Sequence, residues 1–218
     1  MMFQSIAGAE GGACDTGVPV QELANLHPLD EAVDHDRAVE MYGLDERQVG
    51  RGRLQIEEGR VVVLDATAAP ALPWTRLTTA HLDRFKHWIG LPDRYIRSGR
   101  ATPVTPSPGE WSPILEDLTV PLEDDERRDL ALAADGYLFG DSRRMRRYAR
   151  AIEMRLAPFE AVVYAVESLE IRPGARLEIR GCPTVLLARE LVVHGGGCVH
   201  FFTACRVLVD RMVKVELA

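Results

Sequence analysis

Short alternating units near the C-terminus constrain the fold of this chain more than any other feature. Leu169-Glu170-Ile171 is followed eight positions later by Leu177-Glu178-Ile179. An even spacing keeps the first residue of each unit on one face of the predicted strands. Turn residues separate most of the units, so the pattern predicts a series of short strands. Four more units continue it: Leu191-Val192-Val193, Val199-His200-Phe201, Val207-Leu208-Val209 and Val213-Lys214-Val215.

Two architectures fit these units. In a parallel β-solenoid each unit forms one side of a coil, and residues 168–171 would stack on residues 190–193, which lie 22 positions later. The next interval, from Leu191 to Val207, is 16. In an antiparallel meander, a three-residue loop centred on Gly174 would restore the match between apolar residues of adjacent strands. We favour the solenoid and keep the antiparallel meander as the alternative.

The corners between the units carry a resemblance. Pro173-Gly174 lies between two Leu-x-Ile units, and Gly195-Gly196-Gly197 forms a glycine-rich corner after the next strand. Over about fifty residues this pattern resembles short right-handed β-helices, such as those of the pectin-lyase-like group. The resemblance implies a β-helix-like fold and transfers no catalytic residue.

The remaining chain divides by composition into an α+β arrangement. Residues 99–121 contain five of the thirteen prolines and predict a connector that lies on the surface, with Trp111 as its anchor. A hairpin signal surrounds residues 57–60, and Gly140 separates two predicted helices. The predicted divisions are a flexible N-terminal tail (1–30), a small α/β unit (31–98), the proline-rich connector (99–121), a helical pair (122–157) and the solenoid-like domain (158–218).

Charge and cysteine content limit the function classes. Asp and Glu number 33 against 26 Lys and Arg, and a net charge of -7 opposes a global electrostatic grip on nucleic acid. The sequence shows no secretory signal and no apolar run of membrane-spanning length. Its four cysteines form no CxxC pair. These features predict a cytoplasmic protein with reduced thiols and without a membrane partner.

One cluster of potential metal ligands stands out. His194, Cys198, His200 and Cys205 lie within twelve residues, and two imidazoles with two thiols suit tetrahedral zinc. Cys198 and His200 alternate on a predicted strand and so share a face. Their spacing matches no zinc motif, so we interpret these residues as buried thiols and hydrogen-bonded imidazoles, and we predict no cofactor.

The same region offers candidates for catalysis. His194 or His200 could act in acid–base chemistry with Asp210, and a Cys–His pair could act as a nucleophile. No local sequence signature accompanies either arrangement. These residues therefore remain candidates, and the sequence favours a protein without catalytic activity.

A cationic segment lies on the second predicted helix. Such a cluster can bind phosphate, nucleic acid or an acidic partner, and helix N-termini also attract anions. We favour a solvated surface in which these side chains pair with the acidic run 123–126. The candidate anion-binding residues are Arg143, Arg144, Arg147 and Arg150.

A few coils cannot form a self-sufficient solenoid, because terminal strands expose unpaired backbone groups. The last sixty residues are also electrically neutral, which removes a repulsive term between copies. We therefore predict a structural or assembly protein that forms homo-oligomers, with Val207, Val213 and Val215 at the interface. The alternative is a binder of, or an enzyme acting on, a saccharide or small polar molecule, using the solenoid face around His194 and His200.

Overall fold

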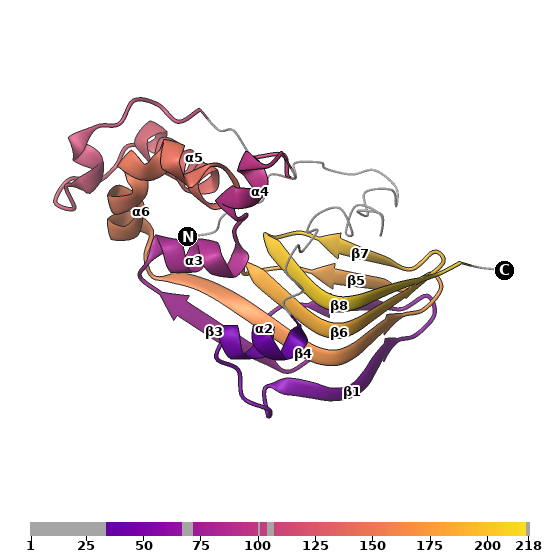
Figure 1. Cartoon of the computed structure of the whole chain (residues 1–218). Coiled ribbons are helices and arrows are strands. Elements are labelled where there is room, and N and C mark those ends of the chain that lie inside the picture. Colours follow the sequence, from indigo (N-terminus) through magenta and orange to yellow (C-terminus); the bar gives the residue numbers. More distant parts are fainter. Residues whose placement is uncertain (1–33, 67–71, 100, 104–106, 217–218) are drawn as a thin grey trace. The chain divides into compact units, whose positions relative to one another are not determined.

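The alternating units form parallel strands in the computed structural model of this protein (Figure 1). The structure describes residues 34–66, 72–99, 101–103 and 107–216. It is a mixed α+β fold whose described part contains five α-helices, two short 3-10 helices and parallel sheets. The helices are α2 (His35–Met41), α3 (Leu82–Ile89), α4 (Asp93–Arg97), η1 (Pro113–Glu116), α5 (Asp124–Phe139), η2 (Ser142–Tyr148) and α6 (Ala149–Leu156).

Two sheets contain all eight strands of the described residues. One has the order β1-β4-β6-β8, with β3 also paired to β4, and the other has the order β2-β5-β7. The pairs β1–β4, β4–β6, β6–β8, β2–β5 and β5–β7 are parallel. The antiparallel meander is therefore wrong for these strands. The strands are β1 (Val49–Ile56), β2 (Val61–Leu64), β3 (Trp74–Thr79), β4 (Phe159–Ile171), β5 (Arg176–Ile179), β6 (Thr184–His194), β7 (Cys198–Phe201) and β8 (Cys205–Val215).

The register confirms one sequence prediction and corrects another. Leu169 pairs with Leu191 as expected from the spacing of 22 residues. Leu191, however, pairs with Met212, and Val207 pairs with Leu186. The expected step of 16 residues is wrong because β8 is one long strand that includes both of the last two units, 207–209 and 213–215. All of the residues that pair lie 21 or 22 positions apart in these two ladders.

The hairpin expected at residues 57–60 is a corner instead. Its two flanking strands join different sheets, since β1 pairs with β4 and β2 pairs with β5. Glycines at this corner and at the next two have positive φ angles, 66° for Gly59, 66° for Gly174 and 76° for Gly196. Such angles strain any residue with a Cβ atom. A turn that connects strands of two different sheets uses the same residue types as a hairpin turn. The sequence signal therefore did not distinguish the two structures.

The strands enclose one apolar core. Leu169, Leu177 and Leu191 are almost inaccessible to solvent and belong to the same cluster, and Val207 packs against it. The prediction that these residues face one core is confirmed. Asp34 caps the start of helix α2, and its carboxylate accepts a hydrogen bond from the amide of Arg37 at 2.8 Å. This helix contacts β6 and β8.

The chain forms two compact units, and their boundaries differ from the expected divisions. One unit comprises Thr78–Glu160, and the other combines the chain up to Leu77 with the chain from Ala161 onward. Strands β1 and β2 thus belong with the C-terminal strands and not to a separate N-terminal α/β unit, because they supply ladder partners for β4 and β5. The expected tail (1–30) lies outside the described residues.

Residues 78–160 form a helical unit. The expected single helix after Gly140 is divided into η2 and α6. In the connector, Trp111 is exposed and Leu115 is buried, so Leu115 is the anchor. The Arg155 guanidinium binds the carbonyl of Leu115 at 3.1 Å and that of Val120 at 2.9 Å. Hydrogen bonds to backbone carbonyls therefore hold the connector against α6. Proline lacks a backbone N–H group but keeps its carbonyl, so the prolines of the connector do not prevent these bonds.

Candidate functional site

A tandem repeat places two buried carboxylates on the sheets. Leu169-Glu170-Ile171-Arg172 and Leu177-Glu178-Ile179-Arg180 have the same sequence, Leu-Glu-Ile-Arg, on either side of one corner. The leucines and isoleucines are in the core. Both glutamates alternate with them and point to the opposite side of their sheets, yet they are only 2% and 6% exposed. A buried carboxylate is stable only when it is paired, so the repeat directs attention to its partners.

Three cationic or ionisable groups surround the Glu170 carboxylate. The Nε atom of Arg53 from β1 lies 2.9 Å from Oε2, and the Nε atom of Arg172 lies 3.2 Å from Oε1. The His194 Nε2 atom at the end of β6 lies 2.7 Å from Oε1. These four residues form the Glu170 cluster. It links three neighbouring strands of the larger sheet, and its arginines remain partly accessible to solvent.

The Glu178 cluster contains the same residue types on the smaller sheet. Arg180 donates to Oε2 of Glu178 at 2.6 Å, and Arg176 lies 3.6 Å from Oε1. His200 is paired with Glu178 in the β5–β7 ladder. Burial, and secondarily the charge of Arg176, lower the pKa of His200, while Glu178 partly opposes this shift. Arg180 also stacks on the exposed ring of Phe202, 4.5 Å from its centroid.

The geometry fits ion pairing better than catalysis. A carboxylate that holds one imidazole nitrogen fixes the orientation of the ring, as in hydrolase triads. The structure pairs His194 with Glu170, whereas the partner expected from the sequence was Asp210. Asp210 lies near the start of α2, and burial raises its pKa while His35 partly opposes this. No hydrogen bond joins His194 or His200 to a nucleophile in the part of the chain that the structure describes.

The four candidate metal ligands are not brought together. Among the described residues there is no group of three or more His, Cys, Asp or Glu side chains that could hold a metal ion. Cys198 and His200 share a face, as expected, because they precede and follow core-facing Val199. Burial raises the pKa of the Cys205 thiol, which keeps it protonated and weakens it as a ligand or nucleophile.

The arginine segment is exposed but uses different partners from those expected. Arg143 binds Asp141 through two nitrogens at 3.1 and 2.9 Å, and Arg150 lies 3.3 Å from Glu116. The acidic run 123–126 instead caps its own helix, where Glu123 and Glu126 form a reciprocal capping box. The Asp141 carboxylate also accepts a hydrogen bond from the backbone amide of Arg143, so a carboxylate of the chain itself already occupies the start of η2.

Arg147 is a third exposed cation of this segment, and its guanidinium lies 4.9 Å from the ring centroid of Tyr148. Arg144 is exposed as well. The Tyr148 ring is buried, and its hydroxyl donates to the carbonyl of Gly109 at 2.5 Å. No stacking surface for a nucleobase is therefore provided by this tyrosine, and the segment offers charge alone.

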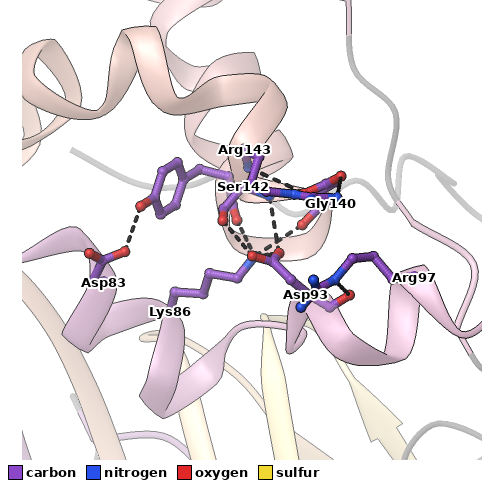
Figure 2. A network of polar contacts seen from close by, with 9 residues as sticks. Asp83, Lys86, Asp93, Arg97, Gly140, Ser142 and Arg143 are labelled. Atoms are coloured by element: carbon purple, nitrogen blue, oxygen red, sulfur yellow. Dashed lines mark hydrogen bonds and ion pairs between the residues drawn. The ribbon is translucent and has the colours of Figure 1, made fainter.

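A second polar network, absent from the sequence predictions, surrounds Lys86 in the helical unit (Figure 2). The Lys86 ammonium group binds the carbonyls of Tyr137 and Gly140 at 2.5 and 3.0 Å and the Asp93 carboxylate at 2.9 Å. These carbonyls lie at the end of α5, where the helix leaves its acceptors without partners. Ser142 completes the network through its hydroxyl, 2.6 Å from Asp93.

The electrostatics indicate that this network is structural. Burial lowers the pKa of Lys86, although Asp93 opposes the shift. Burial alone would raise the pKa of Asp93, but hydrogen bonds from Ser142 and Lys86 bring it below its usual value. All three ammonium hydrogens have acceptors, so this amine is unavailable as a base or nucleophile. The ammonium group connects α3, α4 and the end of α5.

Two sequence signals pointed to the missed residues. The Leu-Glu-Ile-Arg repeat contains both buried glutamates, but alternation alone classified them as solvent-facing. Lys86 is one of only two lysines among 26 basic residues, and it follows Leu82 and Phe85 on the apolar side of its helix. A planar guanidinium cannot replace the compact ammonium group between three acceptors, which explains a lysine at this position.

Comparisons with known proteins identify no relative: no protein-family model, no curated protein and no solved structure matches this chain. No helix in the described parts of the chain is both long and apolar enough to cross a membrane. The function must therefore be argued from the residues and their geometry.

Proposed function

We propose that this protein is a non-catalytic structural or assembly module, that its parallel strands form a short β-solenoid, and that it self-associates through the last strand. The parallel ladders with steps of 21 or 22 residues support the solenoid, as do the repeated corner glycines. Right-handed β-helix geometry is part of this proposal.

The observation that carries the proposal is the edge of β8. This strand has 11 residues and, within the described chain, pairs only with β6. Its other edge has a row of backbone donors and acceptors that can accept another strand. Val213 and Val215 lie beside Val192 and His194 on the side away from the core, and Val215 is exposed. Val207 faces the core, so it would join an interface only through its backbone.

A second copy is the proposed partner. The exposed charges on this strand are of mixed sign, namely Asp210, Arg211 and Lys214. Edge strands that avoid association usually have charges of one sign, proline or a covering segment. Mixed charges can pair with their counterparts in a second copy, and the proposal needs no cofactor and no other partner.

Light scattering of the wild-type protein tests the proposal. At tens of micromolar the mass should exceed the monomer mass of 24.2 kDa. Val213→Lys with Val215→Lys should shift it towards the monomer, because each added charge would lose water at the contact. The matched control is Val61→Lys with Val63→Lys, which changes two exposed valines of β2 in the same way. A monomeric wild type would refute self-association.

One observation favours a second candidate, a saccharide or small polar ligand binder. The outer side of the smaller sheet presents exposed Phe202 beside Arg180 and His200. An exposed ring with hydrogen-bonding side chains around it can bind a sugar, which has an apolar and a polar side. Titration calorimetry with neutral and acidic oligosaccharides should show binding that Phe202→Ala abolishes. An absence of heat for all of these sugars would reject this candidate.

A further inference from the structure

The long strands change the side that faces the core at one shared position. In β8, Val209 and Met212 both face the core, although strict alternation would place residues three apart on opposite sides. The same step of three occurs between Val166 and Leu169 in β4 and between Ala188 and Leu191 in β6. Figure 1 shows the three strands curving together. The bend in β8 therefore lies at Asp210 and Arg211.

This bend limits how a second copy can pair with β8. Two identical strands related by a two-fold axis pair antiparallel, and residues directly opposite each other share a side of the sheet. Two bent strands remain paired along both halves only if their bends coincide. The axis must then pass between Asp210 and Arg211. Val209 comes opposite Met212 of the second copy, and Leu208 comes opposite its Val213.

We infer that the partner of β8 is the β8 strand of a second copy, paired antiparallel with Asp210 of each copy opposite Arg211 of the other. Both of these side chains are exposed and lie on the side away from the core. The register that aligns the bends and the core-facing residues thus also brings two pairs of opposite charge together. This inference rests on the proposed self-association and specifies its geometry.

The charges also argue against head-to-tail stacking. In the existing ladders Arg53 pairs with Ser168, Ser168 with Glu190, and Glu190 with Arg211. A second copy that continued this order would place its own Arg53 directly beside Arg211. Like charges opposite each other destabilise a strand pair. Two-fold pairing avoids this contact and closes the assembly as a dimer instead of an open filament.

Charge exchange tests the register. Asp210→Arg and Arg211→Asp should each weaken the dimer about tenfold, because each change puts two like-charged pairs at the interface. The double variant Asp210→Arg/Arg211→Asp should recover wild-type affinity. The matched control is Asp210→Arg/Lys214→Asp, which has the same net charge but in this register places residue 214 opposite Val207. It should remain weak. Analytical ultracentrifugation measures the dissociation constants of the wild type and the four variants.

The outcomes separate the two proposals. A monomeric wild type refutes self-association and the inference with it. A wild-type dimer in which both double variants recover, or neither recovers, overturns the register but keeps the proposed function, as does an open-ended polymer. Arg211 lies 3.5 Å from Glu190 of its own copy, so Arg211→Asp could unfold the chain. In that case Asp210→Asn and Arg211→Gln replace the charge reversals. Each should weaken the dimer about threefold, and an unchanged dimer affinity would overturn the register.

Discussion

The Glu170 and Glu178 clusters contain the same four residues, one glutamate, two arginines and one histidine, but in different states. In the first, His194 is hydrogen-bonded to the carboxylate. In the second, His200 is the ladder neighbour of Glu178 but the structure joins it to that carboxylate by no hydrogen bond, and its pKa is lowered. Residue type and burial are therefore not sufficient to determine how such a cluster is connected.

The origin of the arginines explains the difference. Arg176 and Arg180 lie two residues before and after Glu178 in the sequence, Arg176 at the start of β5 and Arg180 directly after its end, so both approach the carboxylate from the same chain segment. The Glu170 carboxylate has only one such neighbour, Arg172, and its second arginine comes from β1. A donor from the adjacent strand β6 can then reach Oε1. Two arginines, at positions i−2 and i+2 from the glutamate, thus keep a histidine from its carboxylate, whereas a single arginine at i+2 leaves room for one.

A substitution in the core beneath both clusters should have the largest effect on folding. Leu191→Asp places a carboxylate among Leu169, Met212 and other core residues, where no described cation can pair with it. Burial of an unpaired charge costs several kcal/mol or forces the group to become neutral. We expect insoluble protein on expression, with Arg189→Asp at an exposed position of the same strand as a soluble control. A soluble variant with unchanged melting temperature would contradict the shared core.

The next largest effect should be a difference in stability loss between substitutions of the two glutamates. Glu170→Ala leaves two guanidinium groups and an imidazole without their anion, and removing one partner of a buried pair costs about 3 kcal/mol. Glu178→Ala should cost less, about 1–2 kcal/mol, because no histidine is hydrogen-bonded to that carboxylate, Arg176 lies 3.6 Å from it, and Arg180 keeps its contact with Phe202. Urea unfolding measures both free energies. Equal losses would remove the distinction between the clusters.

The periodic part of the fold was the part that the sequence predicted. Stacking of residue 169 on residue 191 follows from apolar spacing, which depends on local alternation. The pairing of β1 with β4 could not be found in this way, because Val49 and Ala165 are separated by the entire helical unit. The bend at Asp210 was also missed, since it shifts the alternation by one residue and the prediction assumed constant alternation.

The candidate site was predicted only in part. His194 and His200 were identified because they lie close to two cysteines in the sequence, but their glutamates were not, because a glutamate between two apolar residues is usually solvent-facing. One of the cations that pair with buried Glu170 is Arg53, a residue from a distant segment. Contacts of this kind depend on tertiary structure, and one sequence contains no information on which arginine will approach a given carboxylate.

The histidines provide a finer test of the comparison. His194→Gln removes a hydrogen bond to a buried carboxylate and should cost about 1 kcal/mol, while His200→Gln should change stability by less than about 0.5 kcal/mol. Thermal unfolding at pH 7.5 measures the difference. A greater loss for His200→Gln would reverse the assignment of the two clusters.

The smallest expected effect is the pH dependence due to His200. Burial and Arg176 lower its pKa in the folded protein below the usual 6.5, so the folded state disfavours protonation. The stability that neutral His200 contributes is complete above pH 6.5 and is lost as the pH falls through the folded-state pKa. Between pH 7.5 and 5.0 the wild type should therefore lose more stability than His200→Gln, and their melting temperatures should converge. The difference should be small, because the ring is only partly buried, and His194→Gln provides the comparison for the other cluster. If the melting temperatures of wild type and His200→Gln diverge on acidification, with the wild type gaining, then Glu178 and not Arg176 controls this imidazole.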